Sequence, residues 1–405
     1  VTQIGVKDDF FALGGHSLLA TQLISRIRDA FEVKVPLMAL FNQPTVAGLA
    51  QSIEGLDTGN TVHIIEKHDG TVDAPLSYSQ QRLWFIDQMD PGNAVYNLPW
   101  PIRIKGALDI DALHSALNRI IERHESLRTV FRAIAGKPVQ HIQGRLTLPL
   151  PLHDMSGDEN TDIVSYVRDI AQHRFDLSAG PLLTAQLIRV SADEHILMIV
   201  MHHIVADMWS GEVILRELSA LYNAAMKNED AGLNELDIQY TDYAIWEQSE
   251  QRSDLLQTQL NYWKDKLASA PPLLELPTDH PRPPVQTFNG DFEQCLLPEE
   301  LLTELKQLSS TNSSTLFMTL VATFQVLLYR YSGQNDISVG TPIAGRQHTG
   351  LEDLIGVFIN TLVIRSDLSD TPSFSEFVQQ IRTTALEAYE NQDIPFEKIV
   401  EELKP

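Results

Sequence analysis

Two short segments contain side chains that are candidates for covalent attachment or catalysis. The first is DDFFALGGHSLL (8–19), in which Gly14 and Gly15 permit a tight loop directly before Ser17. Apolar residues recur with helical spacing as far as Phe31, so Ser17 opens a predicted helix. Serine is a good N-cap, and that role alone could explain it. A helix N-terminus also favours a phosphate group, so Ser17 is suited to carry a phosphodiester.

The second segment is MHHIVADMWS (201–210), where His202 and His203 follow an apolar run and Asp207 lies four residues after His203. Adjacent residues of a strand point to opposite faces, and no H-E-x-x-H or Cys/His set accompanies the pair, so no metal site is expected. Two interpretations stay open at this point. The histidines could be a structural pair in a core, or one imidazole could do acid–base or positioning chemistry in a cleft while Asp207 holds the loop in shape.

A mixed α/β framework is predicted around these segments. Helical periodicity predicts helices at 109–125, 161–174, 211–226 and 298–309, and apolar runs predict strands at 100–105, 182–190, 195–205, 291–297 and 357–366. The run Ile196 to Met201 is continuously apolar, which is typical of a strand buried on both faces. No repeat of short period is present, so the pattern argues against a solenoid.

The composition indicates a folded, acidic chain. Its 405 residues suggest two or three domains, and 43% hydrophobic against 21% charged residues supports buried cores. Thirty Lys and Arg against 54 Asp and Glu give a net charge of −24. This charge disfavours binding to nucleic acid or to an anionic membrane surface.

The single cysteine, Cys295, excludes an internal disulfide and favours a reducing, cytoplasmic location. It lies in the strand predicted at 291–297, so we expect it to pack in a core and not to act as a nucleophile. No apolar run reaches the length of a membrane span and no signal-peptide pattern is present. Because the chain begins with Val1, we expect it to belong to a larger protein.

The string DDFFALGGHSLLATQL resembles the peptidyl carrier motif, in which the serine carries 4′-phosphopantetheine. The resemblance implies that Ser17 is the attachment residue, with Asp9, Gly14, Gly15 and His16 in the surrounding motif. The later LFNQPTVAGLA (40–50) resembles the last loop and helix of the same family. A small all-α carrier bundle is therefore expected over 1–53, with its first helix missing or only partly present. His at position 16 is typical of carriers that do not feed an epimerisation domain.

The rest of the chain resembles the condensation domains of nonribosomal peptide synthetases. MHHIVADMWS resembles their HHxxxDG motif, and six further strings resemble the other motifs in order: SYSQQRLWF (77–85), RHESLRTVF (123–131), YTDYAIW (240–246), GTPIAGR (340–346), IGVFINTLVIR (355–365) and NQDIPFE (391–397). The resemblance implies an α/β domain of two chloramphenicol acetyltransferase-like lobes with the active site between them. We expect a linker at 54–74, an N-terminal lobe at 75–248 and a C-terminal lobe at 249–405. The family's last strands and helix are expected to be missing.

The resemblance also assigns roles to residues. His203 is expected at the active centre, as a base or as a group that orients the amine, with His202 beside it. Asp207 is expected to pair with an arginine and brace the loop, with Arg346 as the first candidate and Arg128 as the second. Trp209 and Asn360 are expected to line or support the tunnel, or else to be ordinary packing. Arg82 and Trp84 are expected to be structural.

One residue departs from the motif, since Met208 stands where the family usually has Gly. If that Gly adopts a positive φ, Met208 would strain or reshape the loop; otherwise it could narrow the tunnel and alter the substrate or the activity.

The implied function is peptide-bond formation in the biosynthesis of antibiotics and other secondary metabolites. The expected partners are an upstream adenylation domain, a downstream carrier as acceptor and a phosphopantetheinyl transferase. An epimerisation domain is a weaker alternative because of LGGHS and QRLWF, and a heterocyclisation domain would replace His202 and His203 with a carboxylate motif. A non-catalytic docking module is the alternative from another functional class. The motifs and His16 weakly favour an L-configured donor.

Overall fold

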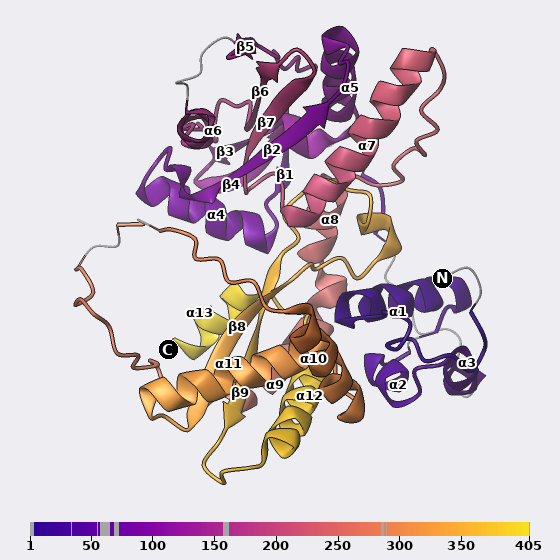
Figure 1. The fold of residues 1–405 in the computed structure, drawn as a ribbon, viewed down its shortest axis with the longest axis vertical. Coiled ribbons are helices and arrows are strands. Elements are labelled where there is room, and N and C mark those ends of the chain that lie inside the picture. The colour runs from indigo at the N-terminus through magenta and orange to yellow at the C-terminus, as the bar shows by residue number, and fades with distance from the viewer. Residues whose placement is uncertain are drawn as a thin grey trace. The chain divides into compact units, whose positions relative to one another are not determined.

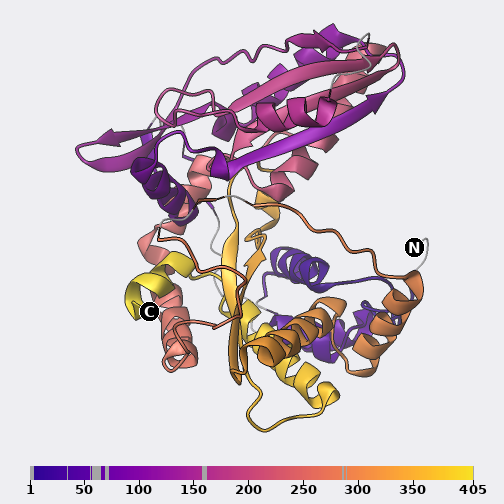
Figure 2. The same cartoon turned by 60° about the vertical axis from the view of Figure 1, so that its left-hand side comes forward.

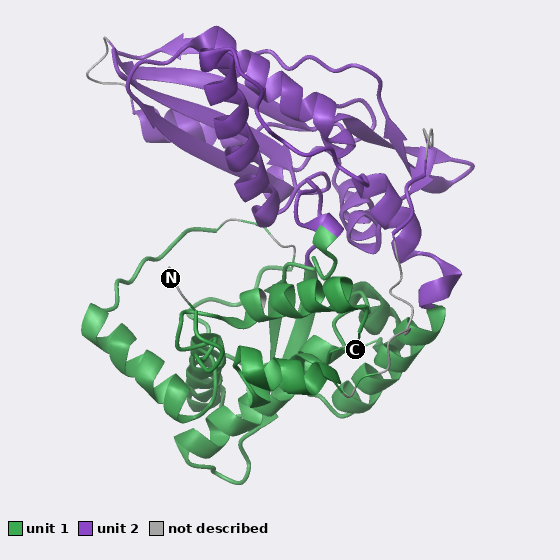
Figure 3. Cartoon of the chain, turned by 90° about the vertical axis from the view of Figure 1, so that its right-hand side faces the viewer, with its two compact units in different colours: residues 1–63, 253–349, 360–405 green, residues 64–252, 350–359 purple. Residues whose placement is uncertain are grey.

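The computed structural model describes residues 4–33, 35–54, 56, 65–68, 73–156, 162–284, 287–288 and 290–404. Contacts divide the chain into two compact units, which Figure 3 distinguishes by colour. Unit 1 comprises Val1–His63, Ser253–Thr349 and Asn360–Pro405, and unit 2 comprises Ile64–Arg252 and Gly350–Ile359. Residues 350–359 therefore belong to unit 2, although the residues on either side of them belong to unit 1.

Unit 2 is a mixed α/β structure (Figure 1). Its helices are α4 (Tyr78–Met89), α5 (Ile110–Arg123), α6 (Ile163–Ala171), α7 (Met208–Lys227) and α8 (Tyr240–Glu247), with 3-10 turns at Ala94–Tyr96, Glu125–Arg128 and Glu250–Arg252. Its strands are β1 (Asp73–Pro75), β2 (Asn97–Lys105), β3 (Thr129–Ile134), β4 (Lys137–Ile142), β5 (Leu152–Asp154), β6 (Leu183–Ser191) and β7 (Glu194–His202).

The strands of unit 2 form two sheets. The larger has the order β2-β7-β6-β5, in which only the β5–β6 pair is parallel. The smaller is antiparallel, with the order β1-β4-β3. Figure 2 shows the long strands β2, β7 and β6 lying side by side. The register pairs Asn97 with His202, so β2 accompanies β7 to its last residue.

Strand β7 is the buried centre of this sheet. Leu197, Ile199 and Met201 pack with α5 and α7 on one face, whereas Met198 and Val200 pack in a second cluster on the other face. The prediction of a strand buried on both faces is confirmed. The strand ends at His202, earlier than predicted, because the N–H of Val205 donates to the carbonyl of His202 at 3.1 Å and forms a turn.

Helices α5 and α7 form where the periodicity predicts them. Asp109 caps α5 by accepting the N–H of Ala112 at 2.9 Å, and the apolar residues at helical spacing from Leu113 to Ile121 are buried. Figure 1 shows α5 beside α7, and the two helices contact one another. The helices predicted at 161–174 and 298–309 are also present, as α6 and α10.

Unit 1 consists mainly of helices. These are α1 (Ser17–Phe31), α2 (Leu37–Asn42), α3 (Val46–Glu54), α9 (Ser253–Leu267), α10 (Glu299–Thr311), α11 (Leu316–Ser332), α12 (Phe374–Glu390) and α13 (Phe396–Leu403), with a 3-10 turn at Thr349–Leu351 that ends in unit 2. Strands β8 (Asp336–Ile343) and β9 (Asn360–Asp367) pair antiparallel. Ala20 of α1, Leu40 of α2 and Leu49 of α3 share one hydrophobic cluster with α11 and α12.

The strand predicted at 291–297 is wrong. Residues 291–297 have no regular structure, and Phe292 and Leu296 are 93% and 99% exposed. A strand needs a neighbouring strand to satisfy its backbone groups, and among the described strands none pairs with this segment. Cys295 is exposed, so the expectation that it packs in a core is also wrong.

The expected linker at 54–74 is partly structured. Ile65 is buried in a cluster of unit 2, and Asp73–Pro75 forms β1 against β4. Residues 55, 57–64 and 69–72 lie outside the described part of the chain.

Candidate active site

A sharp turn between β7 and α7 places His203. The N–H of His203 donates to the carbonyl of Tyr96 at 2.8 Å, immediately after the β2–β7 pairing ends. Ile204, Val205 and Ala206 are at most 1% exposed, and α7 begins at Met208. The turn is therefore fixed on both sides by buried structure, and His203 itself is half-buried.

The two histidines have different surroundings. His202 is 3% exposed, its ring meets the ring of Phe175 edge-on, and its Nδ1 accepts the N–H of Ile204 at 3.2 Å. Burial, together with the neighbouring His203, lowers the pKa of His202 from 6.5 to about 4. His202 is therefore a neutral acceptor that supports the turn.

The Nδ1 atom of His203 is buried and has no hydrogen-bond partner among the described residues. In many catalytic sites a carboxylate or a carbonyl on this nitrogen fixes the tautomer and the direction of the ring. In the described structure, His203 is instead held through its backbone, because its N–H donates to the carbonyl of Tyr96. The ring can supply one imidazole nitrogen for acid–base or hydrogen-bonding chemistry.

Asp207 caps α7. Its Oδ1 accepts the N–H and the hydroxyl of Ser210, both at 2.8 Å, and its Oδ2 accepts the N–H of Phe358 at 3.1 Å. Asp207 is 3% exposed. These bonds brace the turn. Of the two arginines expected to pair with Asp207, Arg128 donates to the carbonyl of Gln143 and to Glu125. Arg346 belongs to unit 1, and its pairing with Asp207 stays a prediction.

Residues 350–359 are held against α7 and α8. The N–H of Gly356 donates to Ser210 Oγ at 3.1 Å, and the hydroxyl of Tyr240 donates to the carbonyl of Val357 at 2.7 Å. The indole N–H of Trp209 donates to the carbonyl of Glu352 at 2.9 Å. Trp209 therefore holds this segment, and its expected role in lining or supporting the tunnel stays a prediction.

Met208 is the first residue of α7 and is 71% exposed. Its backbone is helical, so the position does not require a positive φ and Met208 strains nothing.

Asn360 joins two parts of unit 1. Its amide nitrogen donates to the carbonyls of Gln392 and Ile394, both at 2.9 Å, and its Oδ1 accepts the N–H of Phe396 at 3.0 Å. These bonds connect β9 to the NQDIPFE segment, so Asn360 has a structural role in unit 1.

Ser17 is the first residue of α1, and His16 occupies the N-cap position that the sequence allowed for Ser17. Gly14 has a φ of +102°, and a Cβ on Gly15 would lie 2.4 Å from the ring of Phe10, so the loop requires both glycines. The Ser17 hydroxyl lies 3.4 Å from Thr315 Oγ1 and is half-buried. A hydroxyl at this helix N-terminus fits the attachment of a phosphodiester, because the N–H groups and the dipole favour negative charge there.

Comparison with known families agrees with these features. Residues 71–405 match the family described as condensation domain, and residues 1–53 match the family described as phosphopantetheine attachment site. The first match spans most of the chain.

The chain belongs to the condensation domain family. Condensation domains are the amide-bond-forming acyltransferase domains of nonribosomal peptide synthetases. The attachment-site match confirms that covalent 4′-phosphopantetheine is the cofactor of the preceding carrier region. The expected order of a carrier domain followed by a condensation domain is confirmed.

Relatives and solved structures extend the comparison. A linear gramicidin synthase subunit of Brevibacillus parabrevis is 46% identical over 413 residues, which cover 100% of this chain and 8% of that protein. The X-domain from teicoplanin biosynthesis is 28% identical with a TM-score of 0.77, covering 84% of this chain and 76% of that one. The first condensation domain of the CDA synthetase is 20% identical with a TM-score of 0.71, covering 82% and 80%. The similarity to the CDA synthetase domain shows that the two chains share the α/β fold.

Sequence reasoning missed several residues that hold this condensation domain's histidine turn. Gln80 and Ser210 bond to Ile204 and Asp207 of the turn, and both are buried. The side chains of Gln140 and Tyr240 are also buried, and they bond to Gln80 and Ser77. The S-x-x-Q spacing of Ser77 and Gln80 is a capping-box signal, and the structure forms that box. The contacts to distant segments have no comparable sequence signal.

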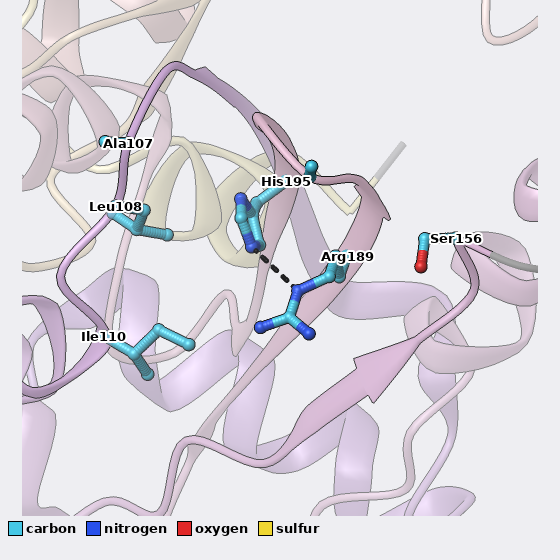
Figure 4. Close-up of a pocket in the computed structure, with 7 residues that line it drawn as sticks. Ala107, Leu108, Ile110, Ser156, Arg189 and His195 are labelled. Atoms are coloured by element: carbon cyan, nitrogen blue, oxygen red, sulfur yellow. Dashed lines mark hydrogen bonds between the residues drawn. The ribbon is translucent and has the colours of Figure 1, made fainter.

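Figure 4 shows a pocket of about 530 Å³ in unit 2, lined by Arg189 and His195 among other residues. His195 is the second residue of β7, and His203 follows the last one. At about 3.3 Å per residue, the eight-residue separation of His195 and His203 corresponds to about 26 Å along the strand. This pocket therefore lies at the opposite end of β7 from the turn that carries His203.

Within the described part of the chain, no helix combines the length and the apolar character that crossing a bilayer requires.

Proposed function

We propose that this chain forms an amide bond between a donor acyl group and an aminoacyl acceptor, with His203 at the reacting centre and Ser17 as the attachment residue. The observation that carries the proposal is the β7–α7 turn, which presents a half-buried imidazole whose Nδ1 has no partner in the described structure. His202 and Asp207 maintain the turn from within the fold.

The reaction needs little activation, because a thioester carbonyl is already reactive. The amine nitrogen attacks that carbonyl, the C–N bond forms, the C–S bond breaks, and the sulfur leaves with the proton that the amine loses. Holding the amine and the carbonyl in line supplies much of the rate. A neutral His203 can accept the amine proton or orient the amine by a hydrogen bond, and both roles require a fixed ring.

Ser17, the first residue of α1, supplies the covalent attachment point. The phosphopantetheine arm, when attached, supplies a thiol that carries the acyl group as a thioester. Gly14 has open space around the position of a Cβ and His16 is exposed, so the loop that precedes Ser17 is accessible.

The proposed partners follow from this chemistry. They are an upstream adenylation domain that supplies the acyl group, a downstream carrier that presents the acceptor amine, and a phosphopantetheinyl transferase. The chain spans under a tenth of the length of the linear gramicidin synthase relative, so its substrates are those of a larger assembly. A cytoplasmic location and no role in nucleic-acid or membrane binding stay predictions from composition.

A dipeptide-formation assay tests the proposal. The full chain is loaded at Ser17 with an aminoacyl pantetheine, and a separate aminoacyl carrier is offered as acceptor. His203→Ala is expected to lower the single-turnover rate by about 10²- to 10⁴-fold, the range for loss of a general acid–base group. His173→Ala, at an exposed histidine, is the control and is expected to keep the wild-type rate.

Mass spectrometry accompanies the assay, and Ser17→Ala is expected to remove the added arm. Arm addition to Ser17→Ala would place the attachment elsewhere, and dipeptide formation by His203→Ala at the wild-type rate would remove His203 from the centre. If the loaded wild-type chain forms no dipeptide, a non-catalytic docking module becomes the better assignment.

A further inference from the structure

The side chain of Gln80 contacts the turn that carries His203. Its Nε2 donates to the carbonyl of Ile204 at 3.3 Å and to Gln140 Oε1 at 3.1 Å, and its Oε1 accepts the N–H of Ser77 at 3.0 Å. Because the N–H of Ser77 can only donate, the atom facing it must be the amide oxygen. The amide nitrogen of Gln80 therefore faces Ile204.

Gln80 is itself held by a buried chain of hydrogen bonds. Gln140, on β4, donates from Nε2 to the carbonyl of Pro75 at 2.8 Å, and both glutamines are 1% exposed. The amides thus connect β1, β4 and the start of α4 to the turn after His203. Buried hydrogen bonds of this kind are costly to break, since no water replaces the lost partner.

The backbone of His203 is anchored on both sides. Its own N–H donates to the carbonyl of Tyr96 at 2.8 Å, and the next residue's carbonyl accepts from Gln80. Since the Nδ1 of His203 has no partner among the described residues, no side chain on that nitrogen sets the direction of the ring. The direction of the ring then follows the backbone of the turn.

We propose that Gln80 is a positioning residue for His203, which it orients by holding the carbonyl of Ile204. This inference rests on the proposed function only where it predicts a change in the rate of dipeptide formation. The orientation of His203 itself can be measured without any condensation activity.

The substitution Gln80→Glu tests the proposal through its pH dependence. The introduced carboxyl keeps an oxygen for the N–H of Ser77, and its second oxygen faces the carbonyl of Ile204 and Gln140 Oε1. When ionised, it repels both oxygens; when protonated, it can donate to one of them, and burial favours the protonated form at low pH. We expect a dipeptide-forming rate about tenfold below wild type at pH 8.5, since small displacements at a reacting centre are costly, and within about threefold of wild type at pH 6.

Gln81→Glu is the matched control. Gln81 lies on the same helix and donates from Nε2 to the carbonyl of Leu76 at 3.1 Å, away from the histidine turn. The ratio of its rate to the wild-type rate is expected to be the same at both pH values. A pH-independent ratio for Gln80→Glu as well would overturn the positioning role.

A second readout separates this inference from the proposed function. Diethylpyrocarbonate modifies accessible neutral imidazoles, and mass spectrometry of the His203 peptide gives the rate of modification. Gln80→Glu is expected to change this rate more than twofold relative to wild type at pH 8.5 and not at pH 6. If the wild-type chain proves inactive but this change is seen, the proposed function fails and the positioning role stands. An unchanged modification rate in a folded variant refutes the positioning role.

The uncharged variant Gln80→Asn covers the case in which the carboxyl prevents folding. Its amide is one methylene shorter and cannot span the distance to Ile204, so we expect a reduced rate and altered labelling at both pH values. Wild-type rate and labelling in Gln80→Asn would overturn the proposal.

Discussion

At the scale of single residues, burial separates two histidines that are adjacent in the chain. His202 is enclosed and serves as an acceptor for the N–H of Ile204, whereas His203 is half-buried and keeps an Nδ1 without a partner in the described structure. The enclosed ring cannot readily be protonated, because the charged form would lose its solvation. Neutral His202 also avoids a positive charge beside His203.

The low pKa of His202 predicts a loss of stability in acid. Unfolded chains protonate histidine below about pH 6.5, whereas the folded state does so only near the lowered pKa of about 4. Between these values the unfolded state binds more protons, so the free energy of unfolding falls as the pH falls, by about 3 kcal/mol at most for this group. His202→Asn keeps an oxygen for the N–H of Ile204, and we expect this part of the pH dependence to disappear.

Urea denaturation at pH 7 and pH 4.5 measures this difference. His173→Asn, at an exposed position, is the control and is expected to follow the wild-type pH dependence. Parallel curves for His202→Asn and wild type would contradict the assignment of His202 as a buried neutral group.

Asp207 is predicted to act on stability. In Asp207→Asn the amide oxygen can still cap α7, but the amide nitrogen then faces the N–H of Phe358, so that two donors oppose each other. We expect a loss of about 1–3 kcal/mol in the free energy of unfolding, measured in urea. Asp109→Asn, at the exposed N-cap of α5, is the control and should change stability by under about 0.5 kcal/mol. Normal stability with complete loss of activity would instead indicate direct contact of Asp207 with substrate.

At the scale of elements, the site is a strand, a turn and a helix, with residues 350–359 held beside them. Ser210 and Tyr240 bind this segment through Gly356 and Val357. Gly356 is required by close packing, because a Cβ there would lie 1.9 Å from Cδ2 of Tyr240. Tyr240 is 2% exposed, so its ring has little room to move aside.

Gly356→Ala is therefore predicted to destabilise unit 2. Overpacking a well-packed core commonly costs about 1–3 kcal/mol, and the short distance here places the expected loss at about 3 kcal/mol or more. Gly350→Ala, in the same segment, is the control, since its Cβ would lie at an ordinary 3.5 Å from Ile238 Cδ1. Thermal or urea unfolding measures both variants, and equal stability of the two would show that the segment rearranges freely.

Elements differed in how well their sequences predicted them. Helices α5, α7 and α10 follow apolar periodicity, with capping side chains at the start of α5 and α7, and β7 follows an uninterrupted apolar run. The segment 291–297 has a strand-like pattern too, yet it is not a strand. Helical hydrogen bonds form within one segment, whereas strand hydrogen bonds require a partner that the local sequence does not reveal.

At the scale of the whole molecule, the order of segments in the chain differs from their grouping in space. Unit 1 collects the carrier helices and most residues after 252, while residues 350–359 belong to unit 2. The two ends of this short segment thus lead into unit 1, and its middle supports the turn that places His203. The β7–α7 turn is held by this segment, because Asp207 and Ser210 accept hydrogen bonds from backbone N–H groups about 150 residues further along the chain.

The sequence alone determined which residues could react and in what kind of local structure. Ser17 follows two glycines at the start of a helix, and His203 follows an apolar strand; both signals are local and survive without knowledge of the fold. Three features became apparent from the folded structure: His202 is a buried acceptor, His16 is the N-cap of α1, and Gln80 bonds to Ile204. These contacts join residues up to 124 positions apart, and hydrogen bonds at such separations depend on how sheets and helices pack, which local spacing does not encode.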